Sequence, residues 1–413
     1  MFENKLFSVL NIKDNDALKN FAKKVKIPVG KLKYYNNEAI FPYYEDLNKI
    51  LSELNISELE FKLSLGVLDS TILDLISNKA KEITDIIKSD SQNGESTAGK
   101  FKPVFTTELG ELYNEDSLSL IKSLPKESVD LIFADPPFNL NKTYESNIND
   151  KLTKEEYLKW TEEWILGCIK LLKEGGSFFI WNLPLWNTYS AEILNKHLNL
   201  RHWIAVDIKY SLPIANKLYP SHYSLLYYIK GEKPNTFNQE RLPLEICKRC
   251  GGDIKDYGGY KDKLNEKGLT LPDVWKDISP VRHRKYKTRG SNQLPVNLLE
   301  RIISMASNEG DVVFDPFGGS GTTYIVSEIL KRQWIGSEIG PCDLIIKRFD
   351  DIDFHRQQIK DIQSKKNVLF TEDMKKIRIK NGHWLPETLK TKESSTKIDN
   401  KEFDSEVNLF TIS

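Results

Sequence analysis

The sequence of 413 residues has little cysteine, no excess of either charge and no long apolar run. Four cysteines are too few for a disulfide framework, so we expect a reducing compartment, most simply the cytoplasm. No apolar stretch approaches the length of a membrane helix, and the N-terminus lacks the basic start and apolar core of a signal peptide. Basic and acidic residues number 59 each, so any affinity for nucleic acid must come from a local basic surface.

The chain divides into segments of different pattern. Residues 1–88 have apolar positions at three- and four-residue spacing, which predicts a small all-α domain. Residues 89–103 begin with a small, polar stretch and are expected to be a linker. Within residues 104–356, strands alternate with helices, which predicts an α/β domain with a mostly parallel sheet and helices on both faces.

Two regions depart from this alternation. Residues 231–291 are rich in Gly, Lys and Asp, and an irregular segment of this length inside an α/β domain is usually functional. Residues 357–413 are polar, and we expect a tail with short elements around 367–370 and 377–385 and a loose end.

A glycine-rich turn follows the apolar run at residues 312–314. Residues 315–321 read Asp-Pro-Phe-Gly-Gly-Ser-Gly and lead into a predicted helix, a geometry that lets backbone amides approach a ligand closely. The turn has neither the Gly-x-Gly-x-x-Gly of a dinucleotide site nor the Gly-Lys-Ser/Thr of a P-loop. The strand after the helix ends at Glu338, whose carboxylate can accept both hydroxyls of a ribose. The alternative is a structural turn beside a surface glutamate.

A second turn, Asp135, Pro136, Pro137 and Phe138, ends the apolar strand predicted at residues 129–134. The carboxyl ends of strands are where α/β enzymes place their sites. The prolines stiffen the loop and remove donors, while the backbone carbonyls can still accept. Asp135 and the Pro136 carbonyl could accept both hydrogens of one exocyclic amino group, and Phe138 could stack on the base that carries it. The alternative is a strand-ending turn with Asp135 as a helix cap.

Together, the two turns resemble those of the DNA amino-methyltransferases that use S-adenosylmethionine. The catalytic turn comes first, the segment 231–291 next and the cofactor turn last, an order that resembles the β class of this family. The likeness covers about residues 104–355 and implies a Rossmann-like methyltransferase sheet. It also implies that the target base is flipped out of the duplex and that its amino nitrogen attacks the sulfonium methyl directly, without a covalent enzyme intermediate and without a metal.

The resemblance also assigns contacts to the cofactor. Residues 112–116 resemble the family's Asn-Gly-Asp stretch, with Glu115 where the family usually has glycine, so Asp116 would accept from the adenine amino group of the cofactor. Residues 295–302 resemble the helix over the methionine end, although Leu294 stands where lysine is usual. The expected cofactor-binding residues are Asp116, Asp315, Phe317, Gly318, Gly319, Gly321 and Glu338.

The resemblance further implies the target base and the partners. In this family, aspartate at the first catalytic position generally goes with adenine N6 and serine with cytosine N4, so Asp135 favours adenine. We expect a site-specific enzyme of a restriction–modification or phage system. Its partners would be double-stranded DNA and a restriction endonuclease that acts separately, and a homodimer is left open. The alternatives are a cytosine-N4 enzyme and a DNA-binding regulator with an inactive methyltransferase fold.

Two segments are candidates for contact with DNA. Residues 281–289 hold five cations and no acid, and we expect phosphate contacts from Arg282, Arg284, Lys285, Lys287 and Arg289; the alternative is a solvated charged loop. Residues 17–57 resemble the helix-turn-helix of phage repressors, with the recognition helix at 29–36 presenting Lys31, Lys33 and Asn36. The alternative is a helical bundle used for dimerisation or packing.

The motif Cys247-x-x-Cys250-Gly-Gly resembles half of a zinc knuckle. Zinc needs four ligands, and no spacing in the chain places Cys168, Cys342 or a histidine to complete a site. The sequence therefore favours a loop with reduced thiols and no metal.

Overall fold

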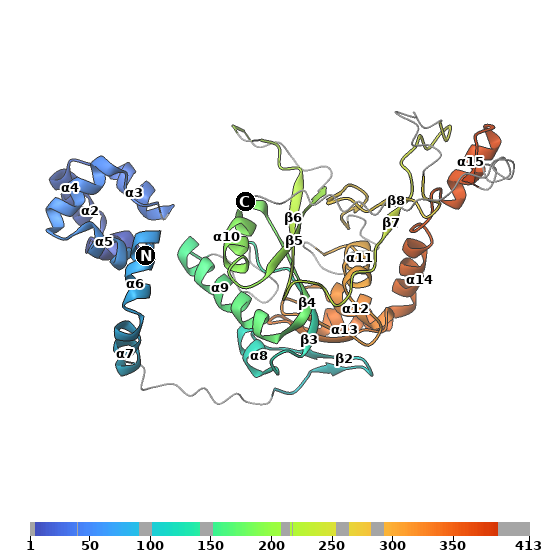
Figure 1. Ribbon diagram of the computed structural model, residues 1–413, viewed down its shortest axis with the longest axis horizontal. Helices are drawn as coiled ribbons and strands as arrows, with labels where there is room; N and C mark the ends of the chain where they lie inside the picture. Colours follow the sequence, from blue (N-terminus) through green and yellow to red (C-terminus); the bar gives the residue numbers. More distant parts are fainter. Residues whose placement is uncertain are drawn as a thin grey trace.

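The structure is a computed structural model that describes residues 5–38, 40–90, 101–140, 152–207, 215–216, 218–252, 264–281 and 293–386 (Figure 1). Among these residues, none of the helices combines the length and the apolar content that crossing a membrane requires.

The N-terminal residues form the small all-α unit that the sequence predicts. Its helices are α1 (Lys5–Val9), α2 (Asn15–Val25), α3 (Val29–Asn37), α4 (Tyr44–Leu54), α5 (Glu58–Leu65), α6 (Ser70–Asn78) and α7 (Ala80–Asp90). The side chains of Asp14, Ser57 and Asp69 accept from backbone amides and so begin α2, α5 and α6. Leu32 and Phe61 are fully buried in an apolar core shared by α1 to α5.

The region that the sequence predicts to be catalytic is built on a nine-stranded sheet with the order β1-β2-β11-β10-β3-β4-β6-β5-β9. The strands are β1 (Phe105–Thr106), β2 (Gly110–Tyr113), β3 (Val129–Ala134), β4 (Leu172–Asn182), β5 (Asn199–Asp207), β6 (His222–Ile229), β9 (Val274–Trp275), β10 (Val312–Asp315) and β11 (Gln333–Ser337). Strands β2, β11, β10, β3 and β4 run parallel, whereas β6 is antiparallel to both β4 and β5.

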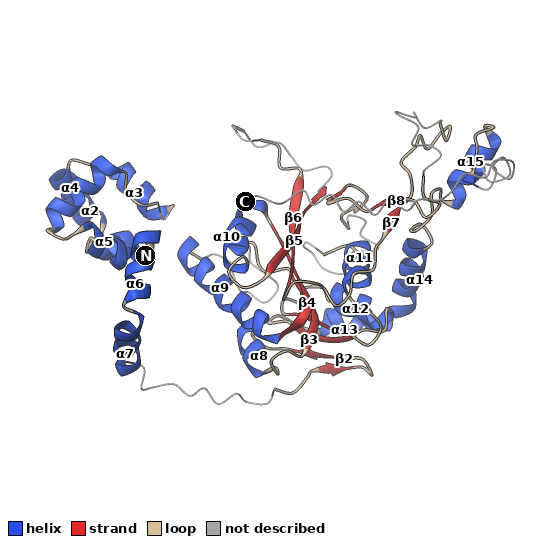
Figure 2. Cartoon of the chain, viewed as in Figure 1, coloured by secondary structure: helices blue, strands red, loops and turns tan. Residues whose placement is uncertain are grey.

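Helices cover both faces of this sheet, as Figure 2 shows. The first face carries α8 (Ser117–Ser123), α9 (Lys154–Leu171) and α10 (Pro184–Leu194), and the second carries α11 (Val296–Ala306), α12 (Thr322–Ile329) and α14 (Ile352–Gln363). Helix α13 (Asp343–Asp350) packs beside α12. Alternate residues of β3 face opposite ways, since Ile132 packs with α8 and α9 while Leu131 packs with α11. The predicted α/β fold with helices on both faces is confirmed.

The described residues of the irregular segment 231–291 include three short strands. Strands β7 (Arg241–Leu242) and β8 (Leu269–Thr270) pair with each other, and β9 joins the edge of the main sheet beside β5.

Residues 357–386 carry more structure than the short elements that the sequence predicts around 367–370 and 377–385, and the predicted loose end lies outside the described residues. The boundary falls inside α14, and α15 (Glu372–Lys380) follows it. Leu369, Phe370 and Leu385 are buried against apolar side chains of the segment 231–291. The backbone amide of Leu244 donates to the Leu369 carbonyl (3.0 Å). We call residues 240–252, 264–270 and 364–386 the C-terminal module. Its apolar side chains pack against residues that are distant in sequence, so the sequence pattern of the tail alone is polar.

Candidate functional site

The two turns predicted from the sequence lie side by side. Strands β10 and β3 are parallel neighbours, with Phe314 opposite Ile132. The cofactor turn follows β10 and the catalytic turn follows β3, so both leave the same edge of the sheet. This carboxyl edge is where open α/β sheets bind their ligands.

The cofactor turn brings backbone against backbone. The Gly318 amide donates to the Ser337 carbonyl (2.7 Å), and the Gly321 amide donates to the Gly318 carbonyl (2.7 Å). A Cβ added at Gly318 would lie 2.5 Å from the Tyr324 hydroxyl and 2.9 Å from the Ser337 carbonyl. Gly319 and Gly321 have φ angles of 54° and 71°. The turn therefore needs glycine both for its conformation and for its close approach.

Asp315 supports this turn from inside. Its side chain is 2% exposed, and its carboxylate accepts from the Thr323 hydroxyl (2.5 Å) and the Phe317 amide (2.9 Å). Burial raises the pKa of Asp315 to about 7, and the negative charge of Glu338 adds to the rise. The two donors oppose this shift. The sequence predicts Asp315 as a cofactor contact, and these bonds give it a role in shaping the turn.

Glu338 lies where β11 ends. Its carboxylate accepts from the amides of Gly319 (2.6 Å) and Gly340 (2.8 Å) and is half-buried. Asn114 donates to the backbone carbonyls of Glu338 (2.7 Å) and Gly340 (2.8 Å). The loop with Asp116 is thus fastened beside Glu338, which brings together two predicted cofactor residues that are distant in sequence. Asp116 also caps α8 through the Ser119 amide (3.0 Å).

The residues around this turn fit S-adenosylmethionine. Each carboxylate oxygen can accept more than one hydrogen, so Glu338 can still accept from the hydroxyls of a ribose. Half-buried Asp116 supplies a second acceptor from the neighbouring loop. The Phe317 ring packs against Trp160 (5.5 Å between ring centroids) and Trp164 (5.2 Å), which fixes its orientation. An adenosine group can bind to such a site, because the carboxylates accept from its hydroxyl and amino groups, the aromatic ring packs on its base and the glycine backbone allows close approach.

Side chains from α9 and α10 hold the catalytic turn. The Tyr157 hydroxyl donates to the Pro137 carbonyl (2.7 Å), and Trp186 Nε1 donates to the Phe138 carbonyl (2.8 Å). Among the residues that the structure describes, no donor reaches the carbonyl of Pro136. The carbonyl that the sequence predicts to accept an amino hydrogen is therefore available, next to half-buried Asp135.

Aromatic side chains surround the catalytic turn. The Phe138 ring is 8% exposed and lies 6.1 Å from the Tyr223 ring, which in turn lies 4.8 Å from Trp181. Burial and the negative charge of Asp135 raise the pKa of Tyr223. Sequence reasoning missed Tyr223 and Trp181, because the pairing that places β6 against β4 leaves no local signal.

The residues predicted to contact DNA lie partly outside the described residues and partly on α3. Arg282, Arg284, Lys285, Lys287 and Arg289 lie outside the described residues. On α3, Lys33 is exposed, whereas Lys31 forms an ion pair with Asp46 (2.5 Å). The prediction that Asn36 is presented to DNA is wrong, because its side chain is 4% exposed and accepts from the Phe7 amide (3.1 Å).

The two cysteines of the knuckle-like motif are exposed free thiols on a tight turn. The Gly251 amide donates to the Cys247 carbonyl (2.7 Å), and Gly251 has a φ of 61°. Cys168 and Cys342 are buried, on α9 and just before α13. Within the described ranges, no group of three or more His, Cys, Asp or Glu side chains could hold a metal ion.

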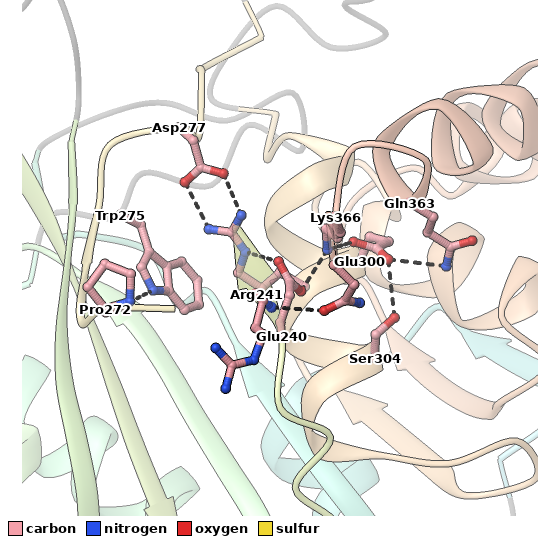
Figure 3. Close-up of polar contacts among 11 residues, drawn as sticks. Glu240, Arg241, Pro272, Trp275, Asp277, Glu300, Ser304, Gln363 and Lys366 are labelled. Carbon is pink, nitrogen blue, oxygen red and sulfur yellow. Dashed lines mark hydrogen bonds and ion pairs between the residues drawn. The ribbon is translucent and has the colours of Figure 1, made fainter. Parts of the chain in front are cut away.

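A buried ion network joins α11 to the C-terminal module (Figure 3). Arg301 is 2% exposed and binds Glu240 (Nε to Oε1, 2.9 Å) and both carboxylate oxygens of Asp277. Lys366 binds Glu240 (2.7 Å) and Glu300. Sequence reasoning missed this network, because charged residues in a polar segment look like a solvated surface.

Comparison with known proteins agrees with this site. Residues 129–347 match the N6/N4 methyltransferase family, described as DNA methylase. The Type II methyltransferase M.BamHI of Bacillus amyloliquefaciens is 49% identical over 371 residues, which are 89% of this chain and 88% of that protein. The DNA adenine methyltransferase YhdJ of Escherichia coli (strain K12) is 33% identical over 238 residues, which are 57% of this chain and 80% of that protein.

A solved structure, the cytosine-N4-specific PvuII DNA methyltransferase, is 24% identical, with a TM-score of 0.47 over 64% of this chain and 95% of that one. The family match spans more than half of the chain, and the M.BamHI match spans most of both proteins. The chain therefore belongs to the N6/N4 family of S-adenosylmethionine-dependent DNA methyltransferases.

Proposed function

We propose that the chain is a Type II, site-specific methyltransferase that methylates an exocyclic amino nitrogen of a base in duplex DNA. The observation that carries the proposal is the available Pro136 carbonyl beside Asp135, at the same sheet edge as the glycine turn. Two acceptors at one point suit an amino group, which has two hydrogens to donate. A restriction endonuclease of the same specificity, acting separately, would complete such a system.

The chain's own residues would act mainly by positioning. S-adenosylmethionine supplies an electrophilic methyl group when it is bound. Asp135 and the Pro136 carbonyl accept the two amino hydrogens and so direct the nitrogen lone pair outward. Tyr157 and Trp186 keep the neighbouring carbonyls of the turn occupied and fix its conformation. Glu338 would hold the ribose of the cofactor and Asp116 would accept from its adenine amino group, while Phe317 and the glycines shape the turn.

Adenine N6 is the first candidate for the target, because aspartate precedes the two prolines. Cytosine N4 is the second candidate. The same two acceptors, Asp135 and the Pro136 carbonyl, could hold its amino group, and Phe138 could stack on a pyrimidine as on a purine. Both bases present the same kind of amino group, so the mechanism is common to them.

DNA would be held outside the pocket by two further segments. We infer phosphate contacts from the cations of residues 282–289. In the N-terminal unit, α2 and α3 are joined by a short turn, with Lys33 exposed on α3. We infer that this unit is a helix-turn-helix that adds affinity for DNA, with Lys31 and Lys33 facing the phosphates.

Methyl transfer from labelled S-adenosylmethionine to duplex DNA tests the proposal. We expect incorporation into DNA, and digestion to nucleosides will identify the base as N6-methyladenine or N4-methylcytosine. Asp135→Ala should bind the cofactor as the wild type does but lose transfer by at least about a hundredfold, because one of two acceptors is gone. No incorporation into any DNA would leave only a DNA-binding regulator, and an active Asp135→Ala variant would refute the assigned role.

A further inference from the structure

The C-terminal module is a folded unit whose surface the methyl-transfer site does not use. Strands β7 and β8 pair within it, and α15 packs on an apolar cluster to which all three of its sequence ranges contribute. Further backbone bonds tie the parts together, including the Leu369 amide to the Glu266 carbonyl (2.7 Å). Any ligand of this unit must be recognised on its exposed side.

A buried arginine fixes the geometry of that exposed side. Arg378 on α15 has no exposed surface and donates to the carbonyls of Gly251 (2.7 Å) and Trp384 (3.0 Å). Its guanidinium also lies over the rings of Phe370 (4.5 Å) and Trp384 (5.0 Å). A Cβ at Gly251 would lie 2.8 Å from Arg378 Cγ. Arg378 therefore clamps the turn at residues 247–252 onto α15.

The contact between Arg378 and the turn at residues 247–252 brings basic side chains of this turn and of α15 close together. Asn381, just after α15, donates to the Cys250 carbonyl (3.0 Å), so the end of α15 adjoins the turn that carries Lys248 and Arg249. Lys376 and Lys380 are exposed on α15. Within the part of the chain that the structure describes, none of these four cations has an acidic partner.

The balance of charge in the module differs from that of the whole chain. The module contains ten Lys and Arg against five Asp and Glu, or eight against four without the buried Lys366, Arg378 and Glu240, whereas the chain has 59 of each. A local excess of cations in a neutral protein marks a surface for polyanions.

The module is also fixed rigidly to the catalytic region. Glu240 and Lys366 belong to the module and contribute to the buried network around Arg301 and Glu300 of α11 (Figure 3). At its other end, α11 begins beside the cofactor turn, where the Thr322 hydroxyl donates to the Leu294 carbonyl (3.2 Å). A ligand held by the module would keep a defined orientation relative to the site of transfer.

We propose that the C-terminal module binds the phosphates of duplex DNA beside the target base, through Lys248, Arg249, Lys376 and Lys380. The inference rests on the proposed function, because it takes duplex DNA as the substrate. It assigns DNA contact to the end of the chain as well as to the segment between the two turns. Phosphate contacts position the duplex and carry no sequence information directly, so these cations raise affinity without choosing the site.

The test compares two variants that each lose four exposed cations. The first is Lys248→Gln, Arg249→Gln, Lys376→Gln and Lys380→Gln. The control is Lys122→Gln, Lys126→Gln, Lys170→Gln and Lys196→Gln, which removes equal charge from helix ends and loops at the amino edge of the sheet, opposite the site. Arg378 stays in both variants, and thermal melting checks that both remain folded.

Affinity is measured with a short fluorescent duplex of mixed sequence over a range of KCl concentrations. Each phosphate contact contributes about 0.9 to the slope of log affinity against log salt, so we expect the module variant to lose roughly 2 to 4 of that slope. We also expect its Kd at low salt to rise by at least about tenfold, because up to four phosphate contacts are lost. The KM for DNA should rise with kcat nearly unchanged, because such contacts stabilise ground and transition states alike. The control should stay close to the wild type.

The outcomes separate this inference from the function on which it rests. If the wild type methylates DNA and the module variant matches the control in slope, Kd and KM, the inference is overturned and the function stands. If the wild type neither binds nor methylates DNA, the proposed function itself fails.

Discussion

Replacing Lys366 with methionine should destabilise the protein far more than replacing an exposed lysine. The Lys366 side chain is 8% exposed and its ammonium binds Glu240 (2.7 Å) and Glu300. Glu240 keeps a second cation, because Arg301 binds it at 2.9 Å. Glu300 is 1% exposed and would keep only neutral donors, from the side chains of Gln363 (3.2 Å) and Ser304 (3.3 Å).

The expected loss of stability follows from the loss of the cation that binds Glu300. Removing one partner of a buried ion pair destabilises by about 3–5 kcal/mol, since the remaining charge stays buried without compensation. For a domain of this size, that corresponds to a fall in Tm of roughly 6–10 °C. Adding Glu300→Gln to Lys366→Met removes the stranded charge, so the double variant should recover at least about half of the loss.

Thermal unfolding, followed by calorimetry and tryptophan fluorescence in one buffer, measures these differences. The control is Lys331→Met, because Lys331 and Glu309 form an ion pair whose side chains are 69% and 66% exposed. Such pairs contribute about 1 kcal/mol or less. The reasoning fails if Lys366→Met melts with the control, or if the double variant melts below the single one.

Three further predictions concern the two turns. Asp315 has a folded pKa of about 7 against an ordinary 3.8, so the folded state holds a proton that the unfolded state loses, and stability should fall as pH rises from about 4 to 7. Asp315→Asn lacks this titration and should gain about 3 kcal/mol relative to the wild type between pH 5 and 8 in denaturant melts; parallel profiles would contradict the assignment. Gly318→Ala places a Cβ 2.5 Å from a tyrosine hydroxyl and should weaken S-adenosylmethionine binding at least about tenfold by calorimetry, whereas Gly30→Ala, which meets nothing within 4 Å, should not. Tyr157→Phe removes the 2.7 Å bond to the catalytic turn and should lower single-turnover transfer by roughly tenfold with cofactor affinity unchanged. Tyr228→Phe, which loses a bond to Asn195 (2.7 Å) instead, serves as its control, and equal activities would remove the positioning role.

The elements with local signals could be predicted from the sequence. The strand before each turn is a run of apolar residues, and glycine is required at Gly318 by contacts within the turn and its neighbouring strand. Both features depend on residues that are close in sequence or on a common α/β arrangement. The parallel sheet and the meeting of the two turns follow from them.

The features that could not be predicted depend on pairings between distant residues. Tyr223 reaches the catalytic turn only because β6 inserts antiparallel between β4 and β5. Leu244 and Leu369 form part of one core although each lies in a polar segment. Asn36 has the polarity of a surface residue, but its side chain is used to bind the backbone of α1. In each case the position of the side chain depends on a contact with a residue that is distant in sequence, and not on the residue type.

The C-terminal module is built from segments that are far apart in sequence, and this affects how the protein folds during its synthesis. Residues 240–252 and 264–270 leave the ribosome early but pack against residues 364–386, which are made near the end of synthesis. At about 5–20 residues per second, the first part waits several seconds or more for the second. A nascent chain can thus complete the parallel core of its sheet while this surface is still unfinished. A messenger truncated before codon 364 would yield a chain that keeps both turns but lacks residues 364–386 of the module, including Lys366.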